Sequence, residues 1–383
     1  MQGLQLLLRY NKHHLPLISP QGSITGVLCA ADLPQMHSSS AINLQHRIQA
    51  ASNHQDISAI KEELPGLCKK LMREGSPVEQ INQYITLIND CAHEKLVSMA
   101  VEKLGPPPCP FAFIALGSEG RQEQTLIVDQ DNGIIYRDDT DEAREYFSEL
   151  ADVACSWLND AGYTFCKGNI MANNSKWCRS LVSWKKLFAG WIAKASNEAI
   201  LNIRIFFDLR VIYGELNIGK ELMKDTFAEL QKRSSQGFFR MIAADHCSSK
   251  PPLGFFKSFI VEKTGEHKDQ LDLKKAMHFP VDFARILAFE HGILQTNTLE
   301  RLEQLHFQKV ITVQEYEGLK KAYTYMMYRR LSSQLGGLNE QRETGNFISP
   351  SILNRMEQEL LKSSFILIAD MQLKMKLRYN AGI

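Results

Sequence analysis

The sequence predicts an α+β fold that is mostly helical: a small sheet, preceded by a helical N-terminal segment and followed by a C-terminal helical bundle. Two short apolar runs, residues 111–116 and 134–136, are typical of buried strands and lie close together in the chain. The segments on either side repeat apolar residues every three or four positions, which is typical of amphipathic helices. With 383 residues, the chain has room for two or three domains.

Residues 1–36 form the first expected unit. Their pattern predicts a strand, a turn, a second strand and the start of a helix. This fragment resembles the closing half of a CBS motif, in which a hydroxyl and an aspartate bind the ribose and phosphate of an adenine nucleotide. Asp32 matches that aspartate, whereas Cys29 stands where threonine or serine is usual. The resemblance implies either a structural remnant or a nucleotide-sensing site.

Residues 37–105 are expected to form a helical region. The serines at 38–40 predict a linker, and residues 76–79 have the pattern of a capping box with proline at the first helical position. Apolar residues at helical spacing then continue over 78–99, and Gly105 with the three prolines after it ends the helix. We expect one long amphipathic helix that packs on the body of the protein.

The next unit, residues 106–183, is expected to hold the sheet and the functional residues. The first apolar run is closed by Gly117 and Ser118. Such a turn can present backbone N–H groups to a phosphate, because glycine allows close approach and a helix start adds a positive dipole. Asp129 and Asp131 follow on a segment that reads as an extended strand, so both carboxylates point to one face. Two such carboxylates can hold a divalent cation.

The last unit, residues 184–383, reads as helices from about Trp184 onward. Residues 312–315 have the pattern of another capping box. Residues 214–220 have the glycine and lysine spacing of a P-loop, but Glu221 stands where a serine or threonine would hold Mg²⁺, and the residues before the segment read as helix. We therefore interpret this segment as a connection between two helices.

The block around Gly117 resembles the polymerase-β-like nucleotidyltransferase superfamily. Gly117-Ser118 matches its glycine–serine motif, and Asp129 and Asp131 match its strand carboxylates. The wider block is similar to the nucleotidyltransferases found beside CBS modules in bacterial signalling proteins, which are relatives of the PII-uridylyltransferase. Further similar segments bring the resemblance to roughly residues 40–380; they include 162–172, 206–214, 297–302 and 330–334.

The resemblance implies a role for each matching residue. Asp129 and Asp131 would be the catalytic residues and would bind Mg²⁺, with Mn²⁺ as the alternative cation. Gly117 and Ser118 would hold the phosphates of an NTP. The helical residues 184–383 would cover the acceptor side as a substrate-binding domain.

Two further positions leave alternatives open. Arg121 would either offset phosphate charge or pair with Glu119 or Glu123 on a short helix. Superfamily members commonly carry a third carboxylate on a later strand, but residues 163–170 contain no acid. Asp208 is the nearest candidate to supply one, and a buried structural ion pair is the alternative reading of that residue.

Composition narrows the possible partners and location. The chain has 44 Lys and Arg against 43 Asp and Glu, a net charge of +1 and a pI of about 7.6, which argues against a broad nucleic-acid footprint. Its eight cysteines have no framework spacing, which favours reduced thiols in the cytoplasm. No apolar segment approaches the length of a bilayer span, so no membrane partner is expected.

The reaction that these residues and the resemblance favour is transfer of NMP from an NTP to a hydroxyl. The relation to PII-uridylyltransferase implies an acceptor on a signalling protein, and a homodimer is left open. The alternative is a catalytically inactive nucleotide-binding sensor or scaffold in signal transduction, which the missing third carboxylate and the CBS-like fragment motivate.

Overall fold

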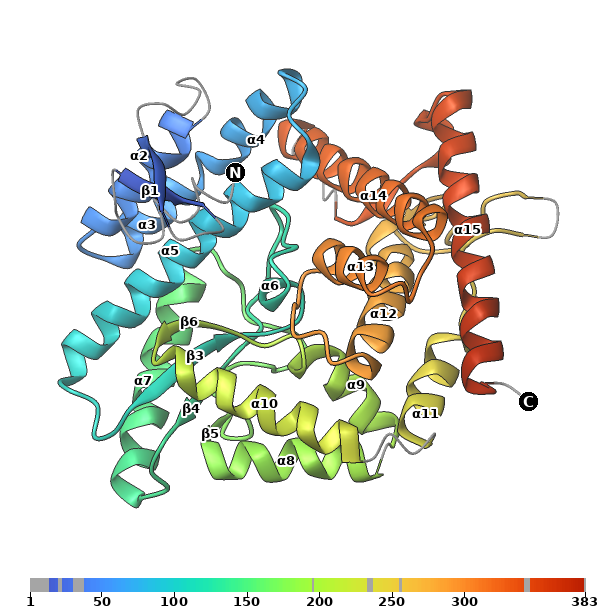
Figure 1. Ribbon diagram of the computed structural model, residues 1–383. Helices are drawn as coiled ribbons and strands as arrows, with labels where there is room; N and C mark the ends of the chain where they lie inside the picture. The colour runs from blue at the N-terminus through green and yellow to red at the C-terminus, as the bar shows by residue number, and fades with distance from the viewer. Residues whose placement is uncertain are drawn as a thin grey trace.

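The computed structural model describes residues 14–19, 23–29, 38–194, 196–232, 237–254, 257–340 and 345–381. It confirms the predicted fold class. Helices surround a small four-stranded sheet, and a helical bundle forms the C-terminal part (Figure 1).

The sheet has the strand order β5 (Cys178–Ser180), β4 (Asn132–Tyr136), β3 (Phe111–Ala115) and β6 (Arg210–Gly214). Strand β3 runs antiparallel to both of its neighbours, whereas β4 and β5 are parallel. Every residue of β3 and β4 is buried. Helices therefore cover both faces of the sheet, which explains why these strands read as continuous apolar runs.

Alternate residues of β3 belong to two different cores. Phe113 packs in a cluster with α5 (Val78–Leu104) and α7 (Asp141–Asp160). Its neighbour Ile114 faces the other cluster, which contains Trp184 and Phe206 of the helices on the opposite face; these helices are α8 (Leu181–Lys194), α9 (Asn197–Phe206) and α10 (Leu216–Lys232). Successive strand side chains point to opposite faces, so this small sheet ties both halves of the molecule together.

Strand β6 corrects a sequence prediction. The chain was expected to be helical from about Trp184, yet α9 ends at Phe206 and a strand begins at Arg210. Residues 211–213 are β-branched or aromatic, and they pair with β3. Gly214 has a φ of +87°, and a Cβ on it would lie 2.3 Å from the Phe111 carbonyl oxygen. Only glycine can bring the backbone this close to β3.

The P-loop-like segment is preceded by this strand and not by a helix, contrary to the sequence prediction. Helix α10 nevertheless begins at Leu216, so Gly219 lies inside the helix and packs on Val211. Glu221 makes ion pairs with Arg137 and Lys185. The segment therefore does not form a phosphate-binding loop.

The N-terminal region agrees with the sequence in part. Strands β1 (His14–Ile18) and β2 (Ile24–Cys29) form the expected antiparallel pair, whereas Asp32 lies outside the described residues. The serines at 38–40 are not a linker, because they form the first turn of α2 (Ser38–Ala50). Two short helices then lead to α5: α3 (His54–Lys61) and α4 (Leu64–Arg73).

Helix α5 lacks the predicted capping box. It begins at Val78 with Pro77 as its N-cap, and no side chain caps it. The Glu79 carboxylate instead accepts a hydrogen bond of 3.0 Å from the Thr324 hydroxyl of the C-terminal bundle. The buried apolar face of α5 and its end at Gly105, which has a φ of +90°, follow the prediction.

The C-terminal bundle contains α11 (Gly237–His246), α12 (Leu273–Glu290), α13 (Thr298–Phe307), α14 (Val313–Glu340) and α15 (Arg355–Tyr379). A short strand pair, β7 (Leu271–Asp272) with β8 (Phe347–Ile348), and the 3₁₀ helix η2 (Pro350–Ile352) connect them. The capping box at 312–315 is confirmed by reciprocal hydrogen bonds between Thr312 and Glu315. Among the described helices, none combines the length and the apolar character that a bilayer span requires.

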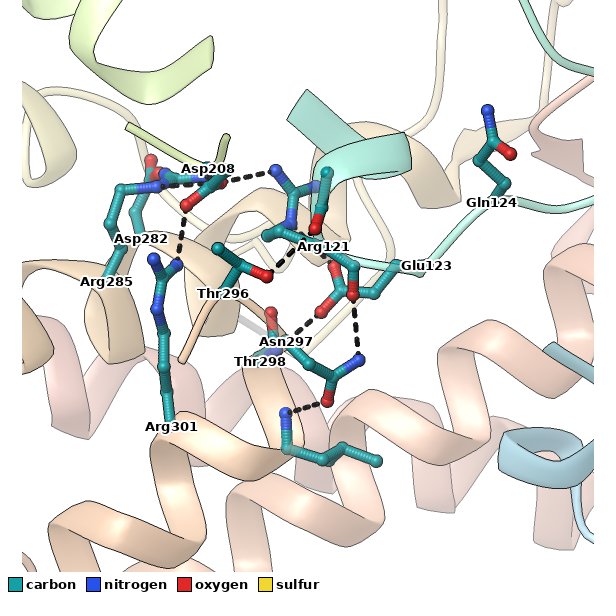
Figure 2. A network of polar contacts seen from close by, with 12 residues as sticks. Arg121, Glu123, Gln124, Asp208, Asp282, Arg285, Thr296, Asn297, Thr298 and Arg301 are labelled. Atoms are coloured by element: carbon teal, nitrogen blue, oxygen red, sulfur yellow. Dashed lines mark hydrogen bonds and ion pairs between the residues drawn. The ribbon is translucent and has the colours of Figure 1, made fainter. Parts of the chain in front are cut away.

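A buried ion cluster joins the sheet region to the bundle (Figure 2). Asp208, in the connection between α9 and β6, is completely buried. Its carboxylate is 2.7 Å from Arg121, 2.6 Å from Arg285 of α12 and 2.8 Å from Arg301 of α13. One carboxylate therefore holds guanidinium groups from three segments that lie far from Asp208 in the sequence.

Hydrogen bonds reinforce the same junction (Figure 2). Residues at the start of α13 donate three hydrogen bonds to residues 120–123, which follow β3: the Thr296 hydroxyl to the Gly120 carbonyl at 2.8 Å, the Asn297 amide to the Arg121 carbonyl at 2.9 Å, and the Thr298 N–H to the Glu123 carboxylate at 2.6 Å. The position of the loop after β3 thus depends on the bundle.

The lowered pKa of Asp208 predicts how the stabilisation of the fold by this junction changes with pH. Burial alone would raise this pKa, but the three guanidinium groups lower it below the ordinary value. A carboxyl group whose pKa is lowered by folding stabilises the fold fully at pH values above its unfolded-state pKa of about 4. This stabilisation is lost as the pH falls towards the folded-state pKa.

We expect Asp208→Asn to lower the free energy of unfolding by about 3–5 kcal/mol at pH 7, because it removes the carboxylate partner of the buried Arg301 and one of the two carboxylate partners of Arg121 and of Arg285. Chemical denaturation as a function of pH measures this, and the difference from the parent should shrink below about pH 4. Glu63→Gln, which breaks the exposed ion pair with Arg47, is the control and should change stability little. A similar small effect of Asp208→Asn at pH 7 would contradict this account.

Candidate nucleotide site

The predicted glycine–serine turn lies at the end of β3. Leu116 is the N-cap of the single-turn helix α6 (Gly117–Gly120), and its N–H donates a hydrogen bond of 2.9 Å to the Asp131 carbonyl. Gly117 has a φ of +54°, a conformation that favours glycine. A Cβ on Gly117 would lie 3.3 Å from Oδ2 of Asp131. The structure thus brings the turn and one of the predicted carboxylates into direct proximity.

The two predicted carboxylates lie on the extended approach to β4, since the strand itself begins one residue after Asp131. Both are half-buried, and Asp129 forms an isolated parallel bridge with Thr164. Burial raises the pKa of Asp131 to about 7, and the negative charge of Asp129 contributes further. A bound cation would relieve this repulsion, so the pair suits a divalent metal ion.

The pair would supply only part of a coordination shell. Within the described ranges, no three or more His, Cys, Asp and Glu side chains gather as a metal cage. Mg²⁺ normally keeps several waters and binds through one or two carboxylates together with substrate phosphates. The residues present therefore fit a cation that arrives with a nucleotide.

Polar side chains beside the carboxylates hold this segment in place. The Gln130 amide donates to the carbonyls of Cys155 and Tyr163 at 3.0 and 2.8 Å. The Asn132 side chain accepts a hydrogen bond of 2.8 Å from the Ala172 N–H. Both Gln130 and Asn132 are completely buried, so the intervening Asp131 is held on a fixed backbone.

Residues 163–170 lie beside this segment, where the resemblance places a third carboxylate. The Gln130 N–H donates to the Thr164 carbonyl at 2.9 Å, and the Cys166 thiol lies close enough to Asp131 to lower the pKa of that carboxyl group. Burial raises the pKa of Cys166 to about 11, so the group is a neutral thiol at pH 7. From this segment the structure therefore places a thiol, and no acid, next to Asp131.

Arg121 directly follows α6, and its positive charge is already compensated by acidic side chains. Its Nε is 2.7 Å from Glu123, and a terminal nitrogen is 2.7 Å from Asp208. Of the two readings of Arg121, these contacts favour the ion pair, with Asp208 as an additional partner. The same contacts favour the structural reading of Asp208, because its carboxylate is occupied by arginines.

A buried pair of an acid and an imidazole lies behind the turn. Glu119 of α6 is almost completely buried, and its Oε1 is 3.2 Å from Nε2 of His93. Burial raises the pKa of Glu119 well above its usual range and lowers that of His93 to about 4, so the imidazole is uncharged at pH 7. The Nδ1 of His93 is 2.7 Å from the Asn89 carbonyl oxygen, so Nδ1 carries the ring proton and Nε2 is the acceptor nitrogen that faces Glu119.

A cleft of about 410 Å³ opens between the turn and the bundle. Gly117, Ser118, Arg121 and Asp131 line one wall. The other wall comes from the helices α9, α11 and α12, whose polar lining residues are Arg204, His246, Lys274, Lys275, His278, Asp282 and Arg285. Sequence reasoning missed this second wall; its one local signal is the pair of lysines at the start of α12, where acidic residues are preferred.

A larger groove of about 730 Å³ lies elsewhere, between the start of α5 and the helices α14 and α15. Its lining includes Val78, Tyr325, Tyr328, Leu360 and Leu367. The smaller cleft is the better candidate site, because it combines a glycine turn, a carboxylate with a raised pKa and several cations.

Two family models match the chain on either side of the small cleft. Residues 62–198 match the family described as "Putative nucleotidyltransferase DUF294". Residues 236–379 match the family described as "Putative nucleotidyltransferase substrate binding domain". No curated protein matches the chain. The turn and the two aspartates lie in the first matched region, and Lys274, Lys275 and His278 lie in the second. The chain therefore carries a nucleotidyltransferase domain of this family together with the C-terminal substrate-binding domain that accompanies it.

Proposed function

We propose that this protein transfers NMP from an NTP to a hydroxyl group in a reaction that depends on Mg²⁺. The observation that carries the proposal is the contact between the glycine turn and a carboxylate: a Cβ on Gly117 would lie 3.3 Å from Asp131 Oδ2. A phosphate bound at this turn would be next to the carboxylate that favours a cation. Nucleotidyl transfer needs this juxtaposition.

Each residue of the first wall has a role in the proposal, and so does Asp129, which precedes Asp131 by two residues and does not itself line the cleft. The backbone at Gly117 and Ser118 receives phosphate oxygens, since the turn leads into a helix and its glycine leaves room for close approach. Asp129 and Asp131 hold the cation, which neutralises charge on the phosphates during transfer. Arg121 acts indirectly, because its ion pairs with Glu123 and Asp208 fix the backbone of the loop.

The acceptor side of the reaction is proposed from the resemblance. Relatedness to PII-uridylyltransferase supports a hydroxyl on a signalling protein as the acceptor, and the matched substrate-binding region supports the bundle as the part that contacts it. A cytoplasmic location of this protein would be consistent with a signalling protein as the acceptor.

Cys166 supports the alternative of a nucleotide sensor that transfers nothing. A neutral thiol stands next to Asp131, where the superfamily commonly has a third carboxylate. Calorimetry with the four NTPs and Mg²⁺ or Mn²⁺, followed by a pyrophosphate-release assay with cell extract as acceptor, separates the two functions. Pyrophosphate release supports transfer, whereas binding without release supports the sensor.

We expect the double variant Asp129→Asn, Asp131→Asn to lose metal-dependent NTP binding and to keep its fold, because the change removes repulsion without opening a cavity. Calorimetric titration with Mg²⁺-NTP and a melting curve check both parts. The matched control is Asp138→Asn with Asp139→Asn, two exposed acids just beyond the other end of β4. Binding by the first variant as tight as that of the parent would show that the site is assigned wrongly.

Gly117→Ala should weaken NTP binding by much more than its loss of folding stability can explain. The new Cβ is strained at a φ of +54° and meets the Asp131 carboxylate. Gly75→Ala is the matched control, because Gly75 also has a positive φ, +76°, but no heavy atom lies within 4 Å of its added Cβ. Both variants should lose about 1–2 kcal/mol of stability, and only the first should lose affinity. Equal affinities would make Gly117 merely structural.

A further inference from the structure

Two adjacent lysines face the glycine turn across the cleft. Lys274 and Lys275 are exposed residues in the first turn of α12, and they line the same cleft as Gly117, Ser118 and Asp131. The positive charge of Lys274 also lowers the pKa of Asp131, against the larger effects of burial and of Asp129. The two walls of the cleft are therefore close enough to interact electrostatically.

These lysines are the uncompensated cations of the cleft. Over the described ranges of the chain, neither ammonium group has a carboxylate within ion-pair distance. The three arginines of the cleft differ in this respect. Arg204 pairs with Asp245 and Asp282, Arg285 pairs with Asp208 and Asp282, and Arg121 pairs with Glu123 and Asp208.

Their place on the helix makes the two charges unfavourable without a ligand. The N-terminus of a helix carries a partial positive charge that favours acidic side chains. Asp272 caps the 18-residue α12 by accepting the Lys275 N–H at 3.0 Å, but the first turn itself contains two lysines and no acid. An anion in the cleft would offset both the ammonium charges and the helix dipole.

A second observation at the same cleft also indicates a missing ligand. His246 of α11 lines the cleft and is only 2% exposed. Its Nδ1 is 4.0 Å from Asp282, but its Nε2 has no hydrogen-bond partner in the described part of the chain. A buried polar atom without a partner is costly, and a bound polar group would provide one.

We propose that Lys274 and Lys275 bind the polyphosphate chain of the nucleotide, with Gly117 and Ser118 on its other side. This inference rests on the proposed function, because it assigns the second wall of the same site. A lysine ammonium group suits phosphate oxygens as a mobile point charge, and these two are free to move into the cleft. The bundle thereby takes part in binding the nucleotide as well as the acceptor, and the site is complete only when both walls are in place.

The test is calorimetric titration of the full chain with inorganic tripolyphosphate in the presence of Mg²⁺. We expect Lys274→Gln with Lys275→Gln to bind roughly tenfold or more weakly than the parent, because it loses charged hydrogen bonds to phosphate. The charge-retaining pair Lys274→Arg with Lys275→Arg should keep most of the affinity. The control pair Lys220→Gln with Lys224→Gln removes two exposed lysines from α10 and should bind like the parent.

Stability gives a readout that does not depend on binding. Neutralising two cations in the first turn of α12 should leave the melting temperature unchanged or raise it, so a loss of affinity cannot be attributed to unfolding. A fall in the melting temperature would overturn the view that these charges are uncompensated.

Three binding results would overturn the proposal. The first is equal affinity of the Lys274→Gln, Lys275→Gln variant and the parent. In that case, loss of binding in the Asp129→Asn, Asp131→Asn variant would still support the proposed function. The second is an arginine variant as weak as the glutamine variant, which would exclude charge as the cause. The third is a parent that binds Mg²⁺-NTP but not tripolyphosphate, which would place the affinity in the nucleoside. A parent that binds neither compound would contradict the proposed function as well.

Discussion

The candidate site depends on one buried carboxylate. Asp208 holds guanidinium groups from the loop after β3, from α12 and from α13, and these segments carry or adjoin both walls of the cleft. Buried charges persist only when they are paired with good geometry, so the cluster allows few arrangements of the sheet region against the bundle. The cleft is thus defined by an interaction whose own members Arg121 and Arg285 line it.

The parts of the fold that depend on local pattern could be predicted from sequence. The apolar run at 111–116, the turn at Gly117 and the long helix α5 follow from side-chain periodicity and glycine placement. Strand β6 could not be found in this way, since residues 210–214 are stabilised as a strand by pairing with β3, which lies far away in the sequence. The capping box before α5 matched a motif, but Glu79 instead accepts a tertiary hydrogen bond from Thr324.

The first wall of the site was predictable and the second was not, for a physical reason. Gly117 and Asp131 lie close in sequence, and the turn and strand between them fix their geometry. Lys274 and Lys275 reach the same cleft only through tertiary packing. The sequence left two roles open for Arg121, offsetting phosphate charge or pairing with Glu119 or Glu123, because its partner Asp208 could not be known from it. Once Asp208 is in place, Arg121 is a structural cation, and the lysines remain as the uncompensated ones.

The central claim is that nucleotide lies between two walls held by the Asp208 cluster. Hydrogen–deuterium exchange of the full chain, with Mg²⁺ and an equimolar mixture of ATP, GTP, CTP and UTP, tests it most directly. The account predicts that residues 116–121 and residues 272–279 both become protected when the nucleotides are added, because both segments line the occupied cleft. Protection of residues 116–121 alone, or of neither segment, would contradict it.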